Sequence, residues 1–374
     1  MTIASGFVDF TFSADQEALR DAVRSFMQAE APKEYVRRMA EHDDVGVTPE
    51  LWAKIVALGW TALLVPEARG GLGLGIIDAV VVQEEMGRAV FPGPYFASAI
   101  AATLAARALG LDEQLEALAA GTQRGTVAID EAGTGDPLAR IRVRANGRGS
   151  RYKLDGVKPM VLDGGSADWM LVPARTRDGL QTFLVERSAQ YAQPAPALDI
   201  TRKFARIEFA ETRAILVGPP GDHAPIWRRI VDDLGVLLAA ELIGVSEAAN
   251  ALALDYAQAR EVFGKPLSKF QVTRHKAVDM LREIEIARVN VHYAAWASEA
   301  DAPDREIAAA MAKAQAAAAA NYVTAECIQI HGGVGYTWAN DAHVYLRRAK
   351  VDDLMLGAQT WQRERVADEY FATL

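Results

Sequence analysis

The 374-residue sequence has a single cysteine, Cys327, so it can form neither an internal disulfide framework nor a cluster of thiolate metal ligands. Its six histidines are scattered and include no HExxH-like pair, so no pattern is typical of a metal site. Acidic residues outnumber basic ones by 49 to 40, so the positive charge of nucleic-acid-binding proteins is missing. We therefore predict a protein that binds neither a metal ion nor nucleic acid.

Long uninterrupted hydrophobic runs are also missing. Arg107 breaks the apolar segment 97–111, and Lys313 and Asn321 lie within the alanine-rich segment 307–323. The amino-terminal residues 1–10 have no basic stretch followed by an apolar core, as a secretory signal would have. These absences predict a cytoplasmic protein without a membrane span, and the lone cysteine fits a reducing compartment.

The longest periodic stretch runs from Trp227 to Gln271 and predicts a packed helix over residues 232–259. Glu241 lies about two helical turns after Leu234, so its carboxylate should point with the leucines, away from water. After the helix, Gly264 and Pro266 predict a turn. The apolar positions of the helix recur at the spacing of one face: Ile230, Leu234, Leu237, Val245, Ala248 and Leu252.

Periodicity divides the chain into three parts. Residues 1–120 are predicted to form an amino-terminal α-helical domain, residues 121–220 a middle β domain, and residues 221–374 a carboxy-terminal four-helix-type bundle. The sequence thus predicts an α+β fold with an antiparallel sandwich or barrel in the middle. The strands are expected at residues 126–130, 140–145, 151–155, 169–174, 182–186 and 206–209.

Four sequence blocks resemble the acyl-CoA dehydrogenase family, FAD enzymes that introduce a 2,3-double bond into acyl-CoA thioesters. An amino-terminal block, GWTALLVPEARGGLGLG followed by EEMGRA, and a β-domain block, YKLDGVKPMVLDGGSADWMLV, are similar to those of the family. AREVFGKPLSKFQ and QIHGGVGYTWANDAHVYLRRAK resemble its two carboxy-terminal flavin blocks. The resemblance covers nearly the whole chain and implies the acyl-CoA dehydrogenase fold, with FAD as cofactor.

The resemblance also implies cofactor-binding positions, usually shared across a subunit interface. Residues matching the family's contacts to the FAD adenylate and pyrophosphate are Arg260, Phe263, Gly264 and Gln271. A second FAD-contact block is matched by Gln329, His331, Gly332 and Gly333. Arginine binds phosphate oxygens in bidentate fashion, and glycine lets a ligand approach the backbone, so the residue types suit this role.

Both positions where the family keeps its catalytic glutamate carry other residues. In the commonest arrangement the glutamate follows an RRAK-like stretch, where this chain has Leu356, with Ala358 at the position of a nearby threonine. In the long-chain and isovaleryl branches it lies near the start of the long helix, where alignment on Gly244 places Leu234 and Gly235. The carboxylate that should take the C2 proton, while the flavin accepts hydride from C3, is therefore missing at both places.

Three interpretations of the missing base remain open. Glu241 could be a displaced base whose pKa is raised by burial, or a buried partner of an arginine. Asp232 and Asp233 adjoin the second family position, or they could be a solvated pair of acids at a helix start. Alternatively, the chain contributes no base, as in α2β2 assemblies of the family that act on steroid side chains, in which one subunit type has lost the glutamate.

The predicted β domain favours the last interpretation. Asp130-Glu131 and Gly135-Asp136 are only loosely similar to the family's flavin-binding loop, and its tryptophan is replaced by Met160, Val161 or Leu162. We therefore predict an acyl-CoA dehydrogenase subunit for a bulky, steroid-like acyl-CoA. It would form a homo- or hetero-tetramer with a second family member. A non-catalytic structural partner and another flavin oxidoreductase on the same fold are the alternatives.

Overall fold

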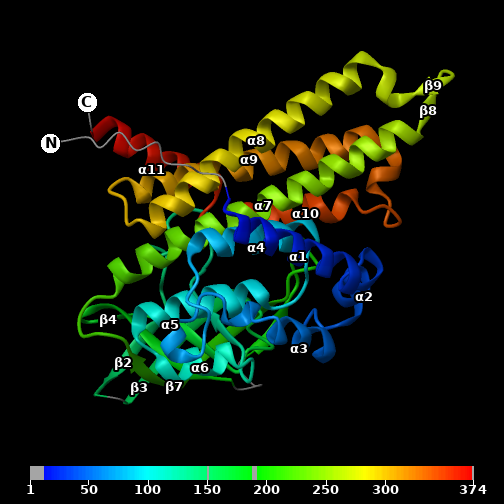
Figure 1. Cartoon of the computed structure of the whole chain (residues 1–374). Helices are drawn as coiled ribbons and strands as arrows, with labels where there is room; N and C mark the ends of the chain where they lie inside the picture. Colours follow the sequence, from blue (N-terminus) through cyan, green and yellow to red (C-terminus); the bar gives the residue numbers. More distant parts are fainter. Residues whose placement is uncertain (1–11, 150, 188–191, 373–374) are drawn as a thin grey trace.

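The computed structural model describes residues 12–149, 151–187 and 192–372. The prediction about residues 1–10 concerns a segment outside these ranges. Figure 1 shows helices at the beginning of the chain, strands in the middle, and long helices at the end. This order confirms the α+β fold predicted from periodicity.

The amino-terminal part is a set of short helices that share one hydrophobic core with the carboxy-terminal bundle. Ser13 and Gln16 form a reciprocal capping box at the start of α1, and Thr48 caps α3 ahead of Pro49. One segment, η3 (Tyr95–Ala102), is a π-helix, a form that is frequent at functional sites. The other helices are α1 (Ala14–Glu30), α2 (Lys33–His42), α3 (Pro49–Ala57), η1 (Trp60–Ala62), η2 (Glu67–Arg69), α4 (Ile76–Arg88), α5 (Thr103–Leu109) and α6 (Asp112–Ala119).

The middle part is a β-barrel with a hydrophobic core of its own, which includes Phe183 and Ile207. Strand β4 pairs with β2, and the order β4-β2-β3-β7-β5 returns to β4 through its pairing with β5, so the sheet closes. The strands are β1 (Gly125–Val127), β2 (Arg144–Arg148), β3 (Arg151–Leu162), β4 (Trp169–Thr176), β5 (Gly179–Glu186), β6 (Ala192–Ala195) and β7 (Phe204–Val217).

The barrel departs from the predicted strands in three ways. It is not purely antiparallel, because β1 and β2 both run parallel to β4. Residues 128–130 and 140–143, predicted as strand, lie outside β1 and β2, and β6 was not predicted. Strand β3 is much longer than expected because it continues through the Asp155-Gly156 pair in a bulge where Gly156 has φ 132°.

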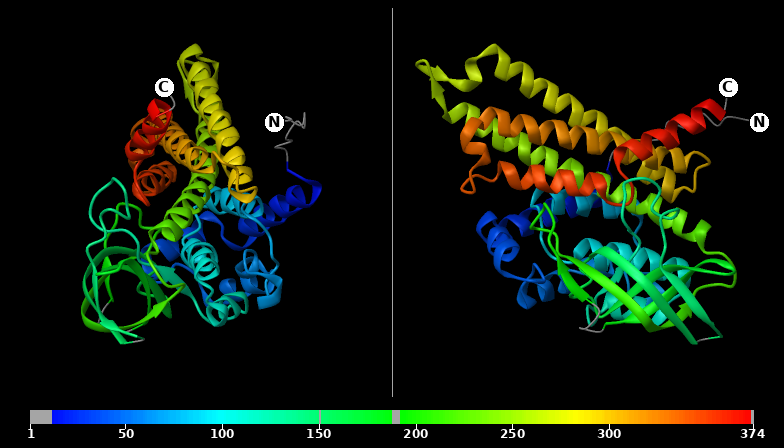
Figure 2. Two further views of the ribbon diagram at one scale, coloured as in Figure 1. Left: turned by 90° about the vertical axis from the view of Figure 1, so that its left-hand side faces the viewer. Right: turned by 180° about the vertical axis from the view of Figure 1, so that it is seen from behind.

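The carboxy-terminal part is a bundle built around α7 (Ala224–Ala259), which contacts both α4 and α9. The helix starts eight residues before the predicted position because Asp232 and Asp233 are buried within it and do not mark its start. Figure 2 shows the bundle lying across the barrel and the short helices. The bundle comprises α7, β8 (Glu261–Val262), β9 (Lys265–Pro266), η4 (Leu267–Lys269), α8 (Gln271–Glu299), α9 (Arg305–His331), η5 (Gly332–Tyr336), α10 (Ala342–Leu354) and α11 (Gln359–Ala372).

Two glycines let α4 and α7 cross with their backbones in contact. A Cβ atom on Gly244 would lie 1.8 Å from the carbonyl oxygen of Glu84, and one on Gly87 would lie 2.1 Å from that of Glu241. Gly244 therefore serves helix packing and leaves no room for a wide ligand beside it. The close contact between α4 and α7 also fixes where Glu241 lies relative to the amino-terminal helices.

Helix α7 is the one helix in the described ranges that is long and apolar enough to cross a membrane. However, 72% of its most apolar window is buried inside the protein, as in the core helix of a folded domain. In the same ranges, no group of three histidine, cysteine, aspartate or glutamate side chains could hold a metal ion. Cys327 is buried and free.

Candidate active site

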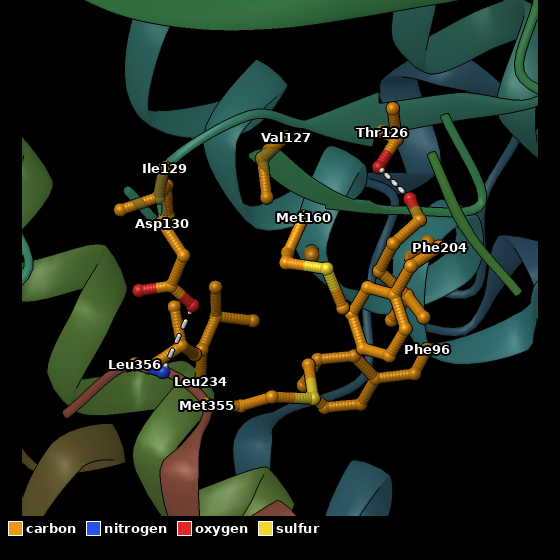
Figure 3. Close-up of a pocket in the computed structure, with 13 residues that line it drawn as sticks. Phe96, Thr126, Val127, Ile129, Asp130, Met160, Phe204, Leu234, Met355 and Leu356 are labelled. Carbon is orange, nitrogen blue, oxygen red and sulfur yellow. Dashed lines mark hydrogen bonds between the residues drawn. The ribbon is translucent and has the colours of Figure 1, made fainter. Parts of the chain in front are cut away.

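A small cavity lies where η3, the barrel and the carboxy-terminal bundle meet (Figure 3). Phe96 enters it from η3, Met160 and Phe204 enter from the barrel, and Leu234 enters from α7. Met355 and Leu356, in the connection between α10 and α11, complete its wall. All three parts of the chain thus contribute to one cavity.

Leu234 and Leu356 line this cavity together, although they lie on different elements. Both side chains are almost completely buried, with exposed fractions of 0% and 5%. These are the two positions at which the sequence comparison with the family leads us to expect a catalytic glutamate. The structure therefore brings both places together and shows an aliphatic side chain at each.

The cavity is nearly filled by side chains. Its volume of about 30 Å³ is enough for on the order of one or two water molecules. Met160 and Leu162, in the segment where the resemblance predicts a tryptophan, both line it, whereas Val161 belongs to the barrel core. The segment in which the resemblance predicts a tryptophan thus contributes flexible or branched aliphatic side chains, which occupy the available space.

Asp130 is the acidic side chain in the lining of this cavity. Its carboxylate accepts a hydrogen bond from the backbone N–H of Leu356 at 3.1 Å and forms an ion pair with Arg140 at 3.3 Å. Burial raises the pKa of Asp130, and the Leu356 N–H and the Arg140 charge oppose this effect. Sequence reasoning missed the role of this carboxylate, because Asp130 looked only like a distant variant of the flavin-binding loop.

Glu241 lies outside the cavity lining, in a buried cluster of charges. One carboxylate oxygen pairs with Arg348, and the other with Arg202 at 2.9 Å. Asp352 and Asp199 complete the cluster by pairing with Arg202 at 2.6 Å and with Arg348 at 2.7 Å. Both oxygens of Glu241 are therefore engaged by guanidinium groups, the surroundings expected for a structural ion-pair partner.

The charge cluster joins the three parts of the chain. Glu241 belongs to α7, Arg348 and Asp352 belong to α10, and Arg202 and Asp199 belong to the segment before β7. Arg348 also donates a hydrogen bond to the carbonyl oxygen of Phe91, between α4 and η3, at 3.1 Å. The cluster thus fixes the positions of the elements that line the small cavity relative to one another. The role of Glu241 as a base stays a prediction.

Asp232 and Asp233 are not a solvated pair of acids at a helix start. Asp232 is 3% exposed and pairs with Arg365 at 2.8 Å. Asp233 is 9% exposed, pairs with Arg229 at 3.2 Å, and accepts a hydrogen bond from the Ser298 hydroxyl. Burial raises the pKa of both carboxyl groups, and their partners oppose this effect. Neither residue lines the small cavity.

The first set of predicted cofactor residues lies at the distal end of α7. Arg260 ends the helix, and the short β8–β9 hairpin then holds Phe263 and Gly264 with positive φ angles of 51° and 75°. Arg260, Gly264 and Gln271 are exposed, and Phe263 is 93% exposed. The Phe263 ring is therefore free to contact another molecule.

The second set lies beside the first, because the ring of His331 stacks on Tyr256 with ring centroids 4.3 Å apart. His331 itself is buried, whereas Gln329, Gly332 and Gly333 are exposed. A Cβ atom on Gly332 or Gly333 would meet nothing in this chain within 4 Å. We call this exposed group, Arg260, Phe263, Gly264, Gln271, Gln329, Gly332 and Gly333, the distal tip.

The distal tip is far from the small cavity of the same chain. Leu234 and Arg260 stand at the two ends of one helical stretch, and at 1.5 Å per residue they are roughly 39 Å apart. Figures 1 and 2 show the β8–β9 hairpin projecting at the end of the bundle away from the barrel. The tip residues of this chain therefore do not reach its own cavity.

This combination of a helical domain, a β-barrel and a helical bundle around a central cavity defines an acyl-CoA dehydrogenase fold. Residues 13–126 match the family model of the acyl-CoA dehydrogenase N-terminal domain, and residues 234–371 match that of the C-terminal domain. The chain belongs to the acyl-CoA dehydrogenase family, whose members are flavin-dependent oxidoreductases acting on the CH–CH group of acyl-CoA.

Relatives and solved structures match the chain over almost its entire length. Acyl-CoA dehydrogenase IpdE2 from Mycolicibacterium smegmatis is 31% identical over 360 residues, covering 96% of this chain and all of the relative. The ChsE4-ChsE5 complex from Mycobacterium tuberculosis contains a chain with 28% identity and a TM-score of 0.87, covering 97% of this chain and 99% of that one. A Tcur3481-Tcur3483 steroid acyl-CoA dehydrogenase variant has 29% identity and a TM-score of 0.86, covering 95% and 97%.

The small cavity does not fit the flavin on which this family depends. The tricyclic flavin ring does not fit into a space that holds on the order of one or two water molecules, because Met160, Met355 and Phe204 occupy the surrounding volume. The distal tip, in contrast, is open. The backbone is accessible at Gly332 and Gly333, beside an exposed arginine and an exposed aromatic ring. The two regions that the resemblance relates to the flavin thus differ, since the small cavity is closed and the distal tip is open.

Proposed function

We propose that this chain is one subunit of a heteromeric, FAD-dependent acyl-CoA dehydrogenase. In this assembly a second family member carries the catalytic glutamate and holds the flavin ring. This chain contributes its distal tip to the adenylate and pyrophosphate of that flavin. The observation that carries the proposal is the pair Leu234 and Leu356 in a cavity of about 30 Å³, which offers neither a base at the expected places nor space for a flavin.

The distal tip supplies what a flavin bound across an interface would need. Arg260 is exposed and can bind phosphate oxygens in bidentate fashion. Gly264, Gly332 and Gly333 leave the backbone open to close approach, and Phe263 offers an aromatic face. Lys265 and Lys269, both at or beside the hairpin, add positive charge. A tip that lies roughly 39 Å from its own cavity can serve only another chain.

Exposed apolar residues along α8 support assembly with another subunit. Val278, Leu281, Ile286 and Val289 are between 44% and 66% exposed, a row of aliphatic groups on one helix. Several exposed aliphatic side chains on one helix are typical of a protein interface. We infer that this face of α8 is buried in a tetramer with the flavin-bearing partner.

A bulky acyl-CoA, such as one derived from a steroid, is the proposed substrate of the assembly. Two of the structures similar to this chain carry a two-part name, and one of them is called a steroid acyl-CoA dehydrogenase. These names describe those proteins, and they support an assembly of two different chains here. When bound in the partner, the flavin would accept hydride from the acyl chain.

Anaerobic turnover with a panel of acyl-CoA thioesters and an electron-accepting dye tests the proposal. The chain would be assayed alone and after co-expression with each neighbouring gene that encodes a family member with the glutamate. We expect activity only from the co-expressed pair, and turnover by the chain alone would contradict the proposal. An equally active partner on its own would make this chain a non-catalytic support, whereas no response to any acyl-CoA would indicate another flavin oxidoreductase.

A further inference from the structure

A second, much larger cavity shares one lining residue with the small one. Phe204 lines both cavities, so the two adjoin at this residue. The second cavity has a volume of about 570 Å³, within the range of small-molecule sites. It therefore has the space that the small cavity lacks. We call it the outer cavity.

Much of the wall of the outer cavity is apolar. Val45 contributes from the connection between α2 and α3, and Ala195 and Ile200 contribute from β6 and the segment that follows it. Pro194 and Phe204 add rigid rings. Surfaces of this kind receive the aliphatic or alicyclic body of a ligand, because they remove apolar area from water.

Two half-buried cations of the outer cavity are available to a ligand, and the exposed Arg187 lines the cavity as well. The Arg124 side chain is half-buried, and its guanidinium has no hydrogen bond or ion pair with any residue that the structure describes. Lys203 is half-buried and donates one hydrogen bond, to the carbonyl oxygen of Ala40 at 2.8 Å, so two of its ammonium hydrogens are not used. Arg202 and Asp199 also line the cavity, but they pair within the buried charge cluster.

Asp163 adds a buried polar group without a partner. Its side chain lines the outer cavity and is 4% exposed, and its Oδ1 atom has no hydrogen-bond partner among the described residues. Burial raises the pKa of this carboxyl group to about 7, although Arg202 and Arg124 act in the opposite direction. The raised pKa limits the negative charge that this carboxyl group presents to an anionic ligand.

We propose that the outer cavity binds an organic carboxylate with an alicyclic body. The carboxylate pairs with Arg124 and Lys203, and the ring system lies against Val45 and Phe204. Asp44 lines the cavity from an exposed position, where water screens its charge. The proposal concerns this chain alone and does not depend on a flavin or on a partner subunit.

Cholate has the proposed chemistry, and its methyl ester differs from it only by the lost charge. Calorimetric titration of the full chain, below the micellar concentration, should show saturable binding of cholate and at least about tenfold weaker binding of methyl cholate. Arg124→Gln should weaken cholate binding about tenfold, because it removes a charge-assisted contact. Arg142→Gln is the matched control, since Arg142 is exposed outside the cavity, and it should bind as the unaltered chain does.

The location of the binding site is tested by a second variant and by a crystal structure. Ala195→Trp fills the outer cavity and should abolish binding, provided that thermal unfolding shows the variant to be folded. Equal affinity for cholate and its methyl ester, or unchanged affinity in Arg124→Gln, would overturn the proposal. A crystal structure with cholate between Leu234 and Leu356 would overturn it as well. Loss of acyl-CoA turnover in an assembled complex has no bearing on this binding experiment.

Discussion

Leu234 on α7 and Leu356 in the connection between α10 and α11 line the same small cavity, each at a position where the resemblance to the family leads us to expect a catalytic glutamate. The folded chain thus preserves the architecture that brings these two positions together. What it lacks is the carboxylate at either place. The nearest acid, Asp130, is held by the backbone of Leu356 and by Arg140.

Restoring the glutamate should not restore an active site. Leu356→Glu places a carboxyl group in a cavity of about 30 Å³ with apolar walls, so the variant should lose on the order of 1–3 kcal/mol of stability. Leu354→Glu is the control, because Leu354 is 52% exposed, and it should leave the melting temperature nearly unchanged. Acyl-CoA-dependent flavin reduction by isolated Leu356→Glu would show that this cavity accepts cofactor and substrate.

The variant Glu241→Gln tests whether Glu241 has a structural or a catalytic role. The substitution leaves Arg348 and Arg202 in a buried cluster with one negative charge fewer, which should destabilise the chain by about 3–5 kcal/mol. We expect turnover per folded complex to stay unchanged. Glu247→Gln, on the same helix but with a side chain 24% exposed, should cost much less stability. A complex that keeps its melting temperature and loses turnover would assign Glu241 as the base.

Substitutions at the distal tip should lower flavin affinity without unfolding the chain. Arg260→Gln removes a phosphate contact and Phe263→Ala removes an aromatic face, and neither side chain is buried in this chain. Each should weaken flavin retention of the co-expressed complex about tenfold or more, measured by absorbance after gel filtration. Arg177→Gln, in the turn between β4 and β5 and with a side chain 78% exposed, is the control. Full flavin retention in both tip variants would argue against the shared site.

Lys313 predicts a defined pH dependence of stability. Its ammonium is buried against the carbonyl oxygens of Asp352 and Asp353, and burial lowers its pKa from 10.5 to about 8. Between these values the unfolded chain binds more protons than the folded chain, so this residue makes stability rise with pH.

Comparison with Lys313→Met isolates that effect from other titrating groups. Between pH 8 and pH 10.5, the stability of the unaltered chain relative to the variant should increase by roughly 3 kcal/mol. Urea unfolding at a series of pH values measures the difference. A difference that is constant over this interval would mean that Lys313 titrates normally in the folded chain.

The sequence predicted the fold because the signals for it are local. Apolar spacing around Leu234 and Leu237 indicates a helix wherever it packs, and the motifs around Arg260 and His331 are contiguous stretches. The helix start was misplaced because Asp232 and Asp233 look like a helix terminus in the sequence. Their partners Arg365 and Ser298 lie far away in the chain, so their burial was not visible.

The site could be predicted only in part, because its decisive features depend on distant contacts. Glu241 was placed correctly on the buried face of α7, but its partners Arg202 and Arg348 come from other parts of the chain. The replacement of the family glutamates was visible in the sequence, whereas the filling of the cavity was not. That filling depends on how Met160 and Met355 meet across it.

The visible absorption spectrum of the purified chain, alone and with its co-expressed partner, tests the central claim most directly. The account predicts that the chain alone is colourless and releases no flavin when it is heated. It predicts that the complex is yellow and contains one flavin for each pair of different subunits. Arg260→Gln in this chain should then lower the flavin content of the complex. A yellow chain with one flavin per polypeptide, bleached by an acyl-CoA, would contradict the account.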